Sequence, residues 1–257
     1  MRKLRLFLVS MRYTRTRQLL SRLAKLIRRR VEERIRPELV GYPAWWYAPF
    51  SLRRSEASKV IEGSVTLLGS SELPYHANLA GTTYEITHVT DWAAPTLSHG
   101  TRLEKLTLHY MEYLFVLTPR ARTTVVLDWI DRVPPWSSEY WKDDWNSYAL
   151  SIRVYVWISL LLRNGFALEA SAKQHLNRSL VQQLRFLMRN LETDIGGNHL
   201  VRNARALVFG GVWFGGREGD LFLERGEALV REAIADQFVD GGVHFELSPA
   251  YHLQVIS

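Results

Sequence analysis

Residues 145–165 read WNSYALSIRVYVWISLLLRNG and decide the fold class. The stretch is almost wholly apolar and ends at a glycine, so we predict a helix buried among other helices. Helical patterns also cover residues 101–117, 168–191, 198–214 and 219–238. Short loops join the segments from residue 145 onward, and almost no strand signal is present. These features predict an all-α protein built from helical hairpins.

The composition fits a globular chain with one large or two small domains. The chain has 257 residues, of which 47% are hydrophobic, and it contains no cysteine. The absence of cysteine excludes disulfides, zinc fingers, iron–sulfur clusters and thiol catalysis. No phosphate-cradling loop and no metal-ligand spacing is visible, so we expect neither a cofactor nor a metal.

The basic charge belongs to the N-terminal part of the chain. Residues 1–60 hold 16 Lys and Arg against 4 Asp and Glu, whereas residues 61–257 hold 17 against 22. We predict a basic amphipathic arm over residues 1–36, whose apolar face comprises Leu19, Leu20, Leu23, Leu26, Ile27, Val31 and Ile35. Such a helix either lies on anionic lipid or another polyanion, or packs on the body with its arginine face in solvent. No nucleic-acid motif accompanies the charge, so no nucleic-acid partner is expected.

The two ends of the chain carry further signals. The opening MRKLRLFLVS has too short an apolar run for a secretory signal, and no run is long enough for a transmembrane helix, so the sequence alone indicates a cytoplasmic protein. Residues 37–100 are rich in Pro and Gly and are expected to be loops with a few extended pieces. At residues 248–257, Ser248 and Pro249 open a helix that stops after two turns. We therefore expect the chain to be the front part of a longer protein.

Polar, proton-handling residues concentrate in two glycine turns that each lead into a helix. The first is DIGGNH at residues 194–199, and the second is DGGVHFELSPAYH at residues 240–252. Helix N-termini favour anions such as carboxylates, and paired glycines allow a sharp turn. Because stacked hairpins bring such loops to the same end, we expect a cleft formed by Asn198, His199, His244 and Tyr251.

These two motifs resemble the heparinase II/III-like polysaccharide lyases. The similarity rests on GGNHLVRNARALVFGGVWF and QFVDGGVHFELSPAYH, supported upstream by LHYMEYL, SYALSIRVYVWI and RYTRTRQLLSRL. The resemblance implies that residues 101–257 form an incomplete (α/α) toroid that lacks the family's C-terminal β-sandwich, which we expect to be encoded downstream. It also makes a periplasmic or cell-envelope location possible.

The resemblance further implies cleavage of an acidic, uronate-containing polysaccharide by β-elimination. In that reaction the uronate carboxylate is neutralised, the C5 proton is removed and O4 is protonated as it leaves. Catalytic roles are expected for Asn198 and His199 in neutralising the carboxylate and for Tyr251 in proton transfer. The side chains expected to bind substrate are His244, Arg153, Glu246, Trp145 and Tyr148. The two aromatic residues in this set, Trp145 and Tyr148, equally suit a plain core.

Two other functions fit the same residues. A toroid glycoside hydrolase needs two carboxylates across the cleft, for which Glu246 and Asp194 are the candidates. A catalytically inactive carbohydrate-binding fragment is the other alternative. The products separate these functions, because elimination alone leaves an ultraviolet-absorbing unsaturated uronide.

Overall fold

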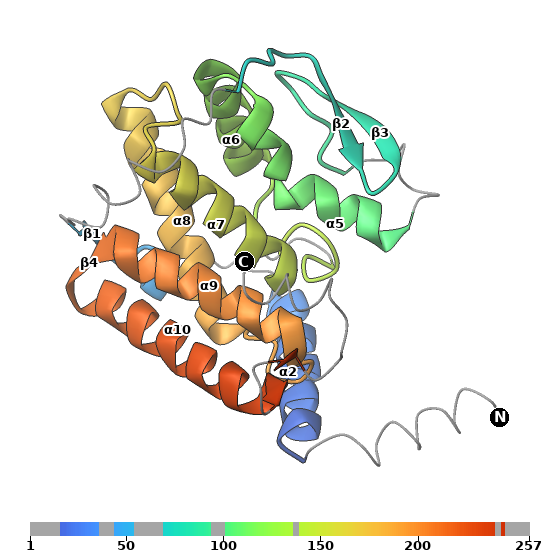
Figure 1. Ribbon diagram of the computed structural model, residues 1–257, viewed down its shortest axis with the longest axis vertical. Coiled ribbons are helices and arrows are strands. Elements are labelled where there is room, and N and C mark those ends of the chain that lie inside the picture. The colour runs from blue at the N-terminus through green and yellow to red at the C-terminus, as the bar shows by residue number, and fades with distance from the viewer. Residues whose placement is uncertain are drawn as a thin grey trace.

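Helices dominate the structure (Figure 1). The computed structural model describes residues 16–35, 44–53, 69–93, 101–135, 139–239 and 243–244. Its mostly helical content confirms the predicted all-α class. The α-helices are α2 (Thr16–Ile35), α5 (Arg102–Tyr110), α6 (Pro119–Arg132), α7 (Ser147–Leu162), α8 (Ala170–Arg189), α9 (Gly197–Trp213) and α10 (Gly216–Gln237). Among these described helices, none is both long enough and apolar enough to cross a membrane.

Helix α7 forms the centre of the core, as residues 145–165 predict. Every side chain of α7 except Tyr148 and Tyr155 is buried. The helix contacts α5, α8 and α9, which surround it. Its apolar character on all sides follows from this position, because a helix enclosed by others has no face left for solvent.

Helices α9 and α10 form a closely packed hairpin (Figure 1). Glycines allow the two backbones to approach. A Cβ at Gly226 of α10 would lie 2.8 Å from the backbone nitrogen of Val208 in α9, and a Cβ at Gly211 would lie 2.7 Å from the backbone nitrogen of Leu223. The predicted helices over 168–191, 198–214 and 219–238 thus correspond to α8, α9 and α10, with small differences at their ends.

The segment before α7 differs from its sequence pattern. The apolar stripe over residues 101–117 divides at Met111, whose φ of 59° ends α5 and starts the 3-10 helix η3 (Glu112–Val116). Helix α6, which was not predicted from the sequence, then begins at Pro119 with Thr118 as its N-cap. Threonine followed by proline is a recognisable start signal, so this helix was predictable.

Short strands occur mainly between and beside the helices. In the loop-rich region, β2 (Tyr75–Leu79) and β3 (Thr82–Ile86) form an antiparallel hairpin whose alternate residues are buried, and β2 packs on α5. The 3-10 helix η1 (Ala44–Trp46) precedes β1. Two further antiparallel pairs join β1 (Ser51–Leu52) to β4 (Phe214–Gly215) and β5 (Phe238–Val239) to β6 (Val243–His244).

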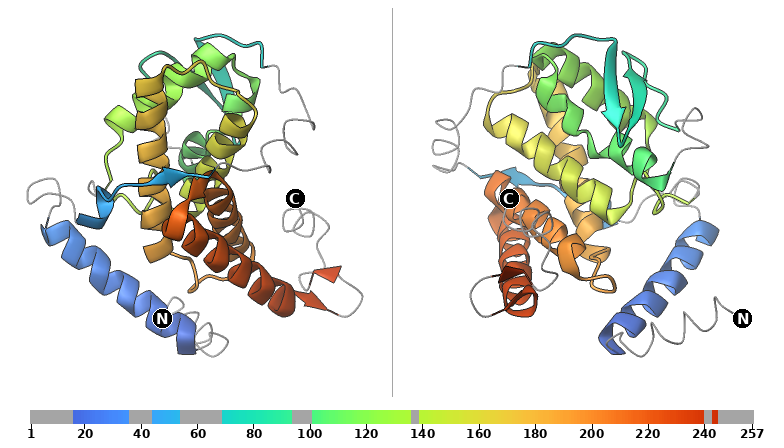
Figure 2. Two further views of the ribbon diagram at one scale, coloured as in Figure 1. Left: turned by 90° about the vertical axis from the view of Figure 1, so that its left-hand side faces the viewer. Right: turned by 45° about the vertical axis from the view of Figure 1, so that its right-hand side comes forward.

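The basic arm packs on the body through its polar face. Helix α2 stands at the edge of the molecule, beside the segment that connects α8 to α9 (Figure 2). Lys25 is buried in this contact, whereas Leu23 and Ile27 are more than half exposed. The expectation that a packed arm keeps its basic face in solvent is wrong for Lys25 and Arg28, which contact the body. Arg30 and Arg34 remain exposed, as do the apolar side chains of Leu23 and Ile27.

Candidate functional site

A cavity of about 760 Å³ lies where the starts of α7 and α9 approach α5 and α2. Its wall combines cations, aromatic rings and the first motif of the sequence. Its lining residues include Lys25, Arg29, Arg102, Trp141, Lys142, Tyr148, Glu192, Asp194, Asn198 and His199. The cavity thus contains Asn198, His199 and Tyr148 of the predicted site residues.

The first turn of α9 opens into this cavity. The preceding residue, Gly196, has a φ of 71° and provides no capping side chain, and Asn198 and His199 follow in the first turn. The positive end of the helix dipole is concentrated there, because the first N–H groups of a helix have no intrahelical acceptors. This start of α9 is therefore suited to an anion such as a carboxylate.

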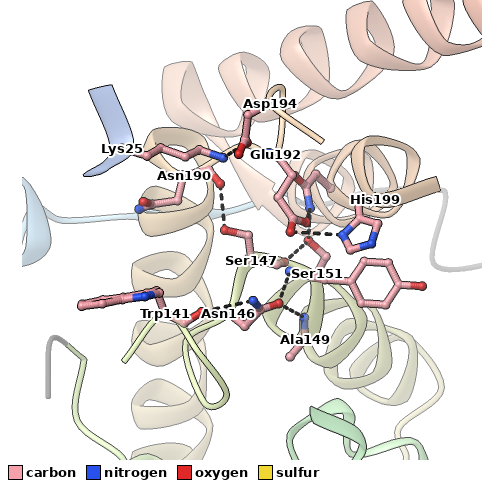
Figure 3. Close-up of polar contacts among 12 residues, drawn as sticks. Lys25, Trp141, Asn146, Ser147, Ala149, Ser151, Asn190, Glu192, Asp194 and His199 are labelled. Carbon is pink, nitrogen blue, oxygen red and sulfur yellow. Dashed lines mark hydrogen bonds and ion pairs between the residues drawn. The ribbon is translucent and has the colours of Figure 1, made fainter. Parts of the chain in front are cut away.

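The buried carboxylate of Glu192 orients the imidazole ring of His199 (Figure 3). Nδ1 of His199 lies 3.2 Å from Oε1 of Glu192, whose side chain is 6% exposed. Asn203 fixes Glu192 at both ends: its Oδ1 accepts from the Glu192 backbone N–H at 2.8 Å, and its Nδ2 donates to Oε2 at 3.2 Å. Since a carboxylate accepts, Nδ1 carries a proton, so Nε2 accepts in the neutral imidazole and donates in the imidazolium. Nε2 has no hydrogen-bond partner among the described residues.

The start of α7 forms the adjacent wall (Figure 3). Asn146 caps the helix by accepting from the backbone N–H groups of Tyr148 and Ala149, and its Nδ2 donates to the Trp141 carbonyl at 3.1 Å. The ring of Tyr148 then lies against that of His199, with centroids 4.4 Å apart. A partly exposed tyrosine and an oriented histidine therefore stand side by side on the cavity wall.

Cations from three separate segments contribute to the cavity. Lys25 of α2 forms an ion pair with Asp194, and Arg102 of α5 donates to the Lys142 carbonyl at 2.8 Å. Arg29 of α2 lies over the Trp141 ring, 5.3 Å from its centroid, and has no hydrogen-bond or ion-pair partner among the described residues. Burial lowers the pKa of Arg29 from its usual 12.5. A half-buried arginine that stacks on an aromatic ring is suited to binding a carboxylate or sulfate together with a sugar face.

Arg153 and Trp145 lie in the core instead of the cavity wall. Arg153 is completely buried: it donates to Gln183 and to the backbone carbonyls of His109 and Asp144, and it stacks 4.0 Å above the Trp129 ring. Burial lowers its pKa to about 9. Trp145 is 3% exposed. The prediction that Arg153 and Trp145 contact a substrate is therefore wrong, because both side chains are buried. Arg153 instead supports the site by fixing the segment that carries Trp141 and Asn146.

The second motif falls mostly outside the described residues. Tyr251 and Glu246 are not among them, and of His244 only the backbone is described, paired with Phe238. The expected meeting of His244 and Tyr251 with Asn198 and His199 therefore stays a prediction. Within the described residues, no group of three or more acidic or histidine side chains is arranged to hold a metal ion.

Sequence reasoning missed Glu192 and the cations Arg29, Arg102 and Lys142. For Arg29 a signal existed, because Ser21, Lys25 and Arg29 recur at every fourth position on the polar side of the arm. That spacing places them on one face of a helix. For Arg102 and Lys142 no comparable pattern exists, since each comes from a different segment and they meet only in the folded chain.

The fold and the cavity define a helical protein with a cation-rich pocket suited to an anionic ligand. The chain belongs to the heparinase II/III family, because residues 118–257, more than half of the chain, match the model described as Heparinase II/III N-terminus. This match confirms the resemblance that the two motifs indicated. No curated protein and no solved structure matches the chain. Arg29 and Arg102 lie upstream of the matched residues.

Proposed function

We propose that the protein acts as a polysaccharide lyase on a uronate-containing polymer, with the cavity between α2, α5, α7 and α9 as its active site. The observation that carries the proposal is the His199–Glu192 pair at the uncapped start of α9. This arrangement places a fixed imidazole beside the positive end of a helix, and both suit an elimination next to a carboxylate. Family membership supports a polysaccharide substrate.

The reaction assigns a role to each group. Asn198 and the start of α9 bind the uronate carboxylate, and with His199 they stabilise the negative charge that develops as the C5 proton leaves. Tyr251 is the group proposed to transfer protons. The electron pair of the C5–H bond forms the C4=C5 double bond, the C4–O4 bond breaks, and O4 receives a proton. Glu192 acts through His199 by fixing its tautomer and orientation.

Other groups on the wall are suited to holding the polymer. Arg29 over Trp141 offers a charge and an aromatic face together, and Tyr148 offers a second ring beside His199. Aromatic rings pack on the apolar faces of sugars, and arginine binds carboxylate or sulfate. We propose that His244 and Glu246 join this substrate-binding set, that the helices belong to an incomplete (α/α) toroid, and that a β-sandwich domain completes the cleft.

The described carboxylates favour elimination over hydrolysis. A glycoside hydrolase needs one carboxylic acid to protonate the leaving oxygen and a second carboxylate across the cleft. In the cavity, Glu192 is engaged by His199 and Asn203, and Asp194 is paired with Lys25. Neither carboxylate is available for a glycosidic oxygen.

The test incubates the protein with alginate, hyaluronan, chondroitin sulfate, heparan sulfate and bacterial capsular polysaccharides. Ultraviolet absorbance of the C4=C5 bond reports elimination, and reducing ends without absorbance report hydrolysis. We expect absorbance to rise with at least one polymer and to be abolished by His199→Ala, Asn198→Ala and Tyr251→Phe. The control is Glu224→Gln, an exposed residue of α10, which keeps full activity.

Two outcomes contradict the proposal. Reducing ends without absorbance would assign the protein to the hydrolases. Binding of a uronate polymer by wild type and by Tyr251→Phe and Asn198→Ala alike, with no product from any polymer, would make it a carbohydrate-binding protein.

A further inference from the structure

Helix α2 exposes a row of large apolar side chains on one face. Among the described residues, five of the twelve exposed large aliphatic side chains belong to this one helix, with exposed fractions between 46% and 63%. They are Leu20, Leu23, Leu26, Ile27 and Val31. The spacing of these residues places them along one side of the helix. We call this set the leucine face.

The opposite side of α2 is tied to the body, so the helix cannot rotate to bury the leucine face. Ser21 bonds Thr193 at 2.9 Å, Lys25 pairs with Asp194, and Arg28 donates to Asn190 at 2.8 Å. Near the end of the helix, Glu32 accepts from the Tyr140 hydroxyl. These contacts recur along the length of the helix on its body side. Rotation of the leucine face inward would break all of them.

Arginines accompany the leucine face on the outward side of α2. Arg30 and Arg34 are exposed, and their helical positions fall next to those of Ile27 and Val31. The helix contains seven Lys and Arg but two Asp and Glu, and Glu32 is bound to Tyr140 on the body side. A second copy of the same face would bring arginines toward arginines, whereas anionic lipid offers both an apolar layer and phosphates.

We propose that α2 docks the protein on an anionic lipid surface. The leucine face enters the boundary between headgroups and acyl chains, and Arg30 and Arg34 pair with lipid phosphates. The helix lies in the plane of the surface. The inference goes beyond the proposed catalytic function and does not depend on it. Because Lys25 and Arg29 of the same helix line the cavity, the polymer-binding site lies next to the surface.

The test measures sedimentation of the protein with vesicles of phosphatidylcholine alone and with vesicles that contain phosphatidylglycerol. We expect binding to the anionic vesicles, weakened by added salt. Leu23→Gln combined with Ile27→Gln abolishes binding, because both side chains are exposed and their loss removes the buried apolar area. Arg30→Gln and Arg34→Gln each weaken binding about fivefold.

The matched control is Leu221→Gln combined with Ile234→Gln, which changes two exposed apolar residues of α10 and keeps wild-type binding. Circular dichroism verifies that each variant is folded. Absence of binding to anionic vesicles overturns the proposal, as does equal binding by the Leu23/Ile27 variant. A dimer in solution, measured by light scattering and dissociated by the Leu23/Ile27 variant, would assign the leucine face to a second copy and also overturn it.

Discussion

The Glu192 carboxylate is bound on one oxygen by His199 and on the other by Asn203, so a single buried acid holds two side chains of α9. Asn203 in turn donates to Ser151 of α7 at 3.0 Å, which links this pair to the core helix. The orientation of His199 in the cavity is therefore set by two buried side chains, Glu192 and Asn203. Preorganisation of this kind makes the pair testable by substitution of Glu192.

Glu192→Gln is expected to reduce elimination activity by about 10²-fold or more, because an amide has one accepting oxygen and cannot accept from both Nδ1 of His199 and Nδ2 of Asn203. The turnover number should fall, the Michaelis constant should change little, and the rate–pH profile should change shape. Steady-state kinetics over a pH series measures both effects. An unchanged profile with a proportional loss of folded protein would mean that Glu192 supports the fold alone.

Lys25→Met is expected to lower the free energy of unfolding by about 1–3 kcal/mol, because Asp194 then loses its partner in a largely buried contact. Urea titration measures the loss, and a double-mutant cycle with Asp194→Asn isolates the pair. The control is Arg231→Met, which removes an exposed pair with Glu227 and should cost less than about 0.5 kcal/mol. Equal losses for Lys25→Met and Arg231→Met would contradict a structural role for the arm contact.

Acid should destabilise the protein through His109. This histidine is completely buried and accepts a hydrogen bond from Nε1 of Trp129 at 3.2 Å; burial, aided by Arg153, lowers its pKa to about 3. Between pH 6.5 and 3 the unfolded chain binds a proton that the folded chain does not. The free energy of unfolding therefore falls as the pH drops through this window, by at most about 1.4 kcal/mol per pH unit from this group.

His109→Asn tests this pH dependence, because the amide oxygen can still accept from Trp129 but does not titrate. Urea titrations from pH 7 to 4 should give a shallower loss of stability for the variant than for wild type. Above pH 6.5 the contribution of His109 is constant. Parallel curves over the whole range would contradict the assignment.

Gly226→Ala is expected to destabilise the protein by about 1–3 kcal/mol, although alanine favours helices. The added Cβ meets the backbone of α9 at Val208 and lies 3.0 Å from the Ala204 carbonyl, and neither atom can move without separating the hairpin. Thermal denaturation measures the effect. Glu224→Ala on the exposed side of α10 is the control and should remain within about 0.5 kcal/mol of wild type.

The long helices were predictable because their apolar patterns are continuous. The stretch at 145–165 identifies α7, and the glycine turn at 196–197 marks the start of α9. The break at Met111 was not predictable, since a methionine with a positive φ is imposed by the surrounding packing and not by local preference. Local patterns thus describe the elements well and their interruptions poorly.

The amphipathic pattern of α2 identified its two faces but not which one meets the body. A hydrophobic stripe usually packs inward. Here Thr193, Asp194 and Asn190 present a polar wall, and the polar face of the helix is the one that matches it.

The candidate site was predictable where one motif supplied it and not where several segments meet. Asn198 and His199 follow from the GGNH turn, and both line the cavity. Arg153 was predicted to bind an acidic substrate because it is a single arginine within an otherwise apolar helical stretch, and the sequence shows no partner for it. Its stacking on Trp129 and its bonds to Gln183 and His109 emerge only in three dimensions.

Asp194 connects the helix that carries the leucine face to the turn that lines the cavity. It is held by Lys25 of α2, and four residues later the chain reaches Asn198, which lines the cavity. This ion pair connects α2 directly to the turn that positions Asn198 and His199. Thermodynamic reciprocity then requires that, if docking of α2 alters the affinity of the cavity for its ligand, the ligand alters docking by the same factor.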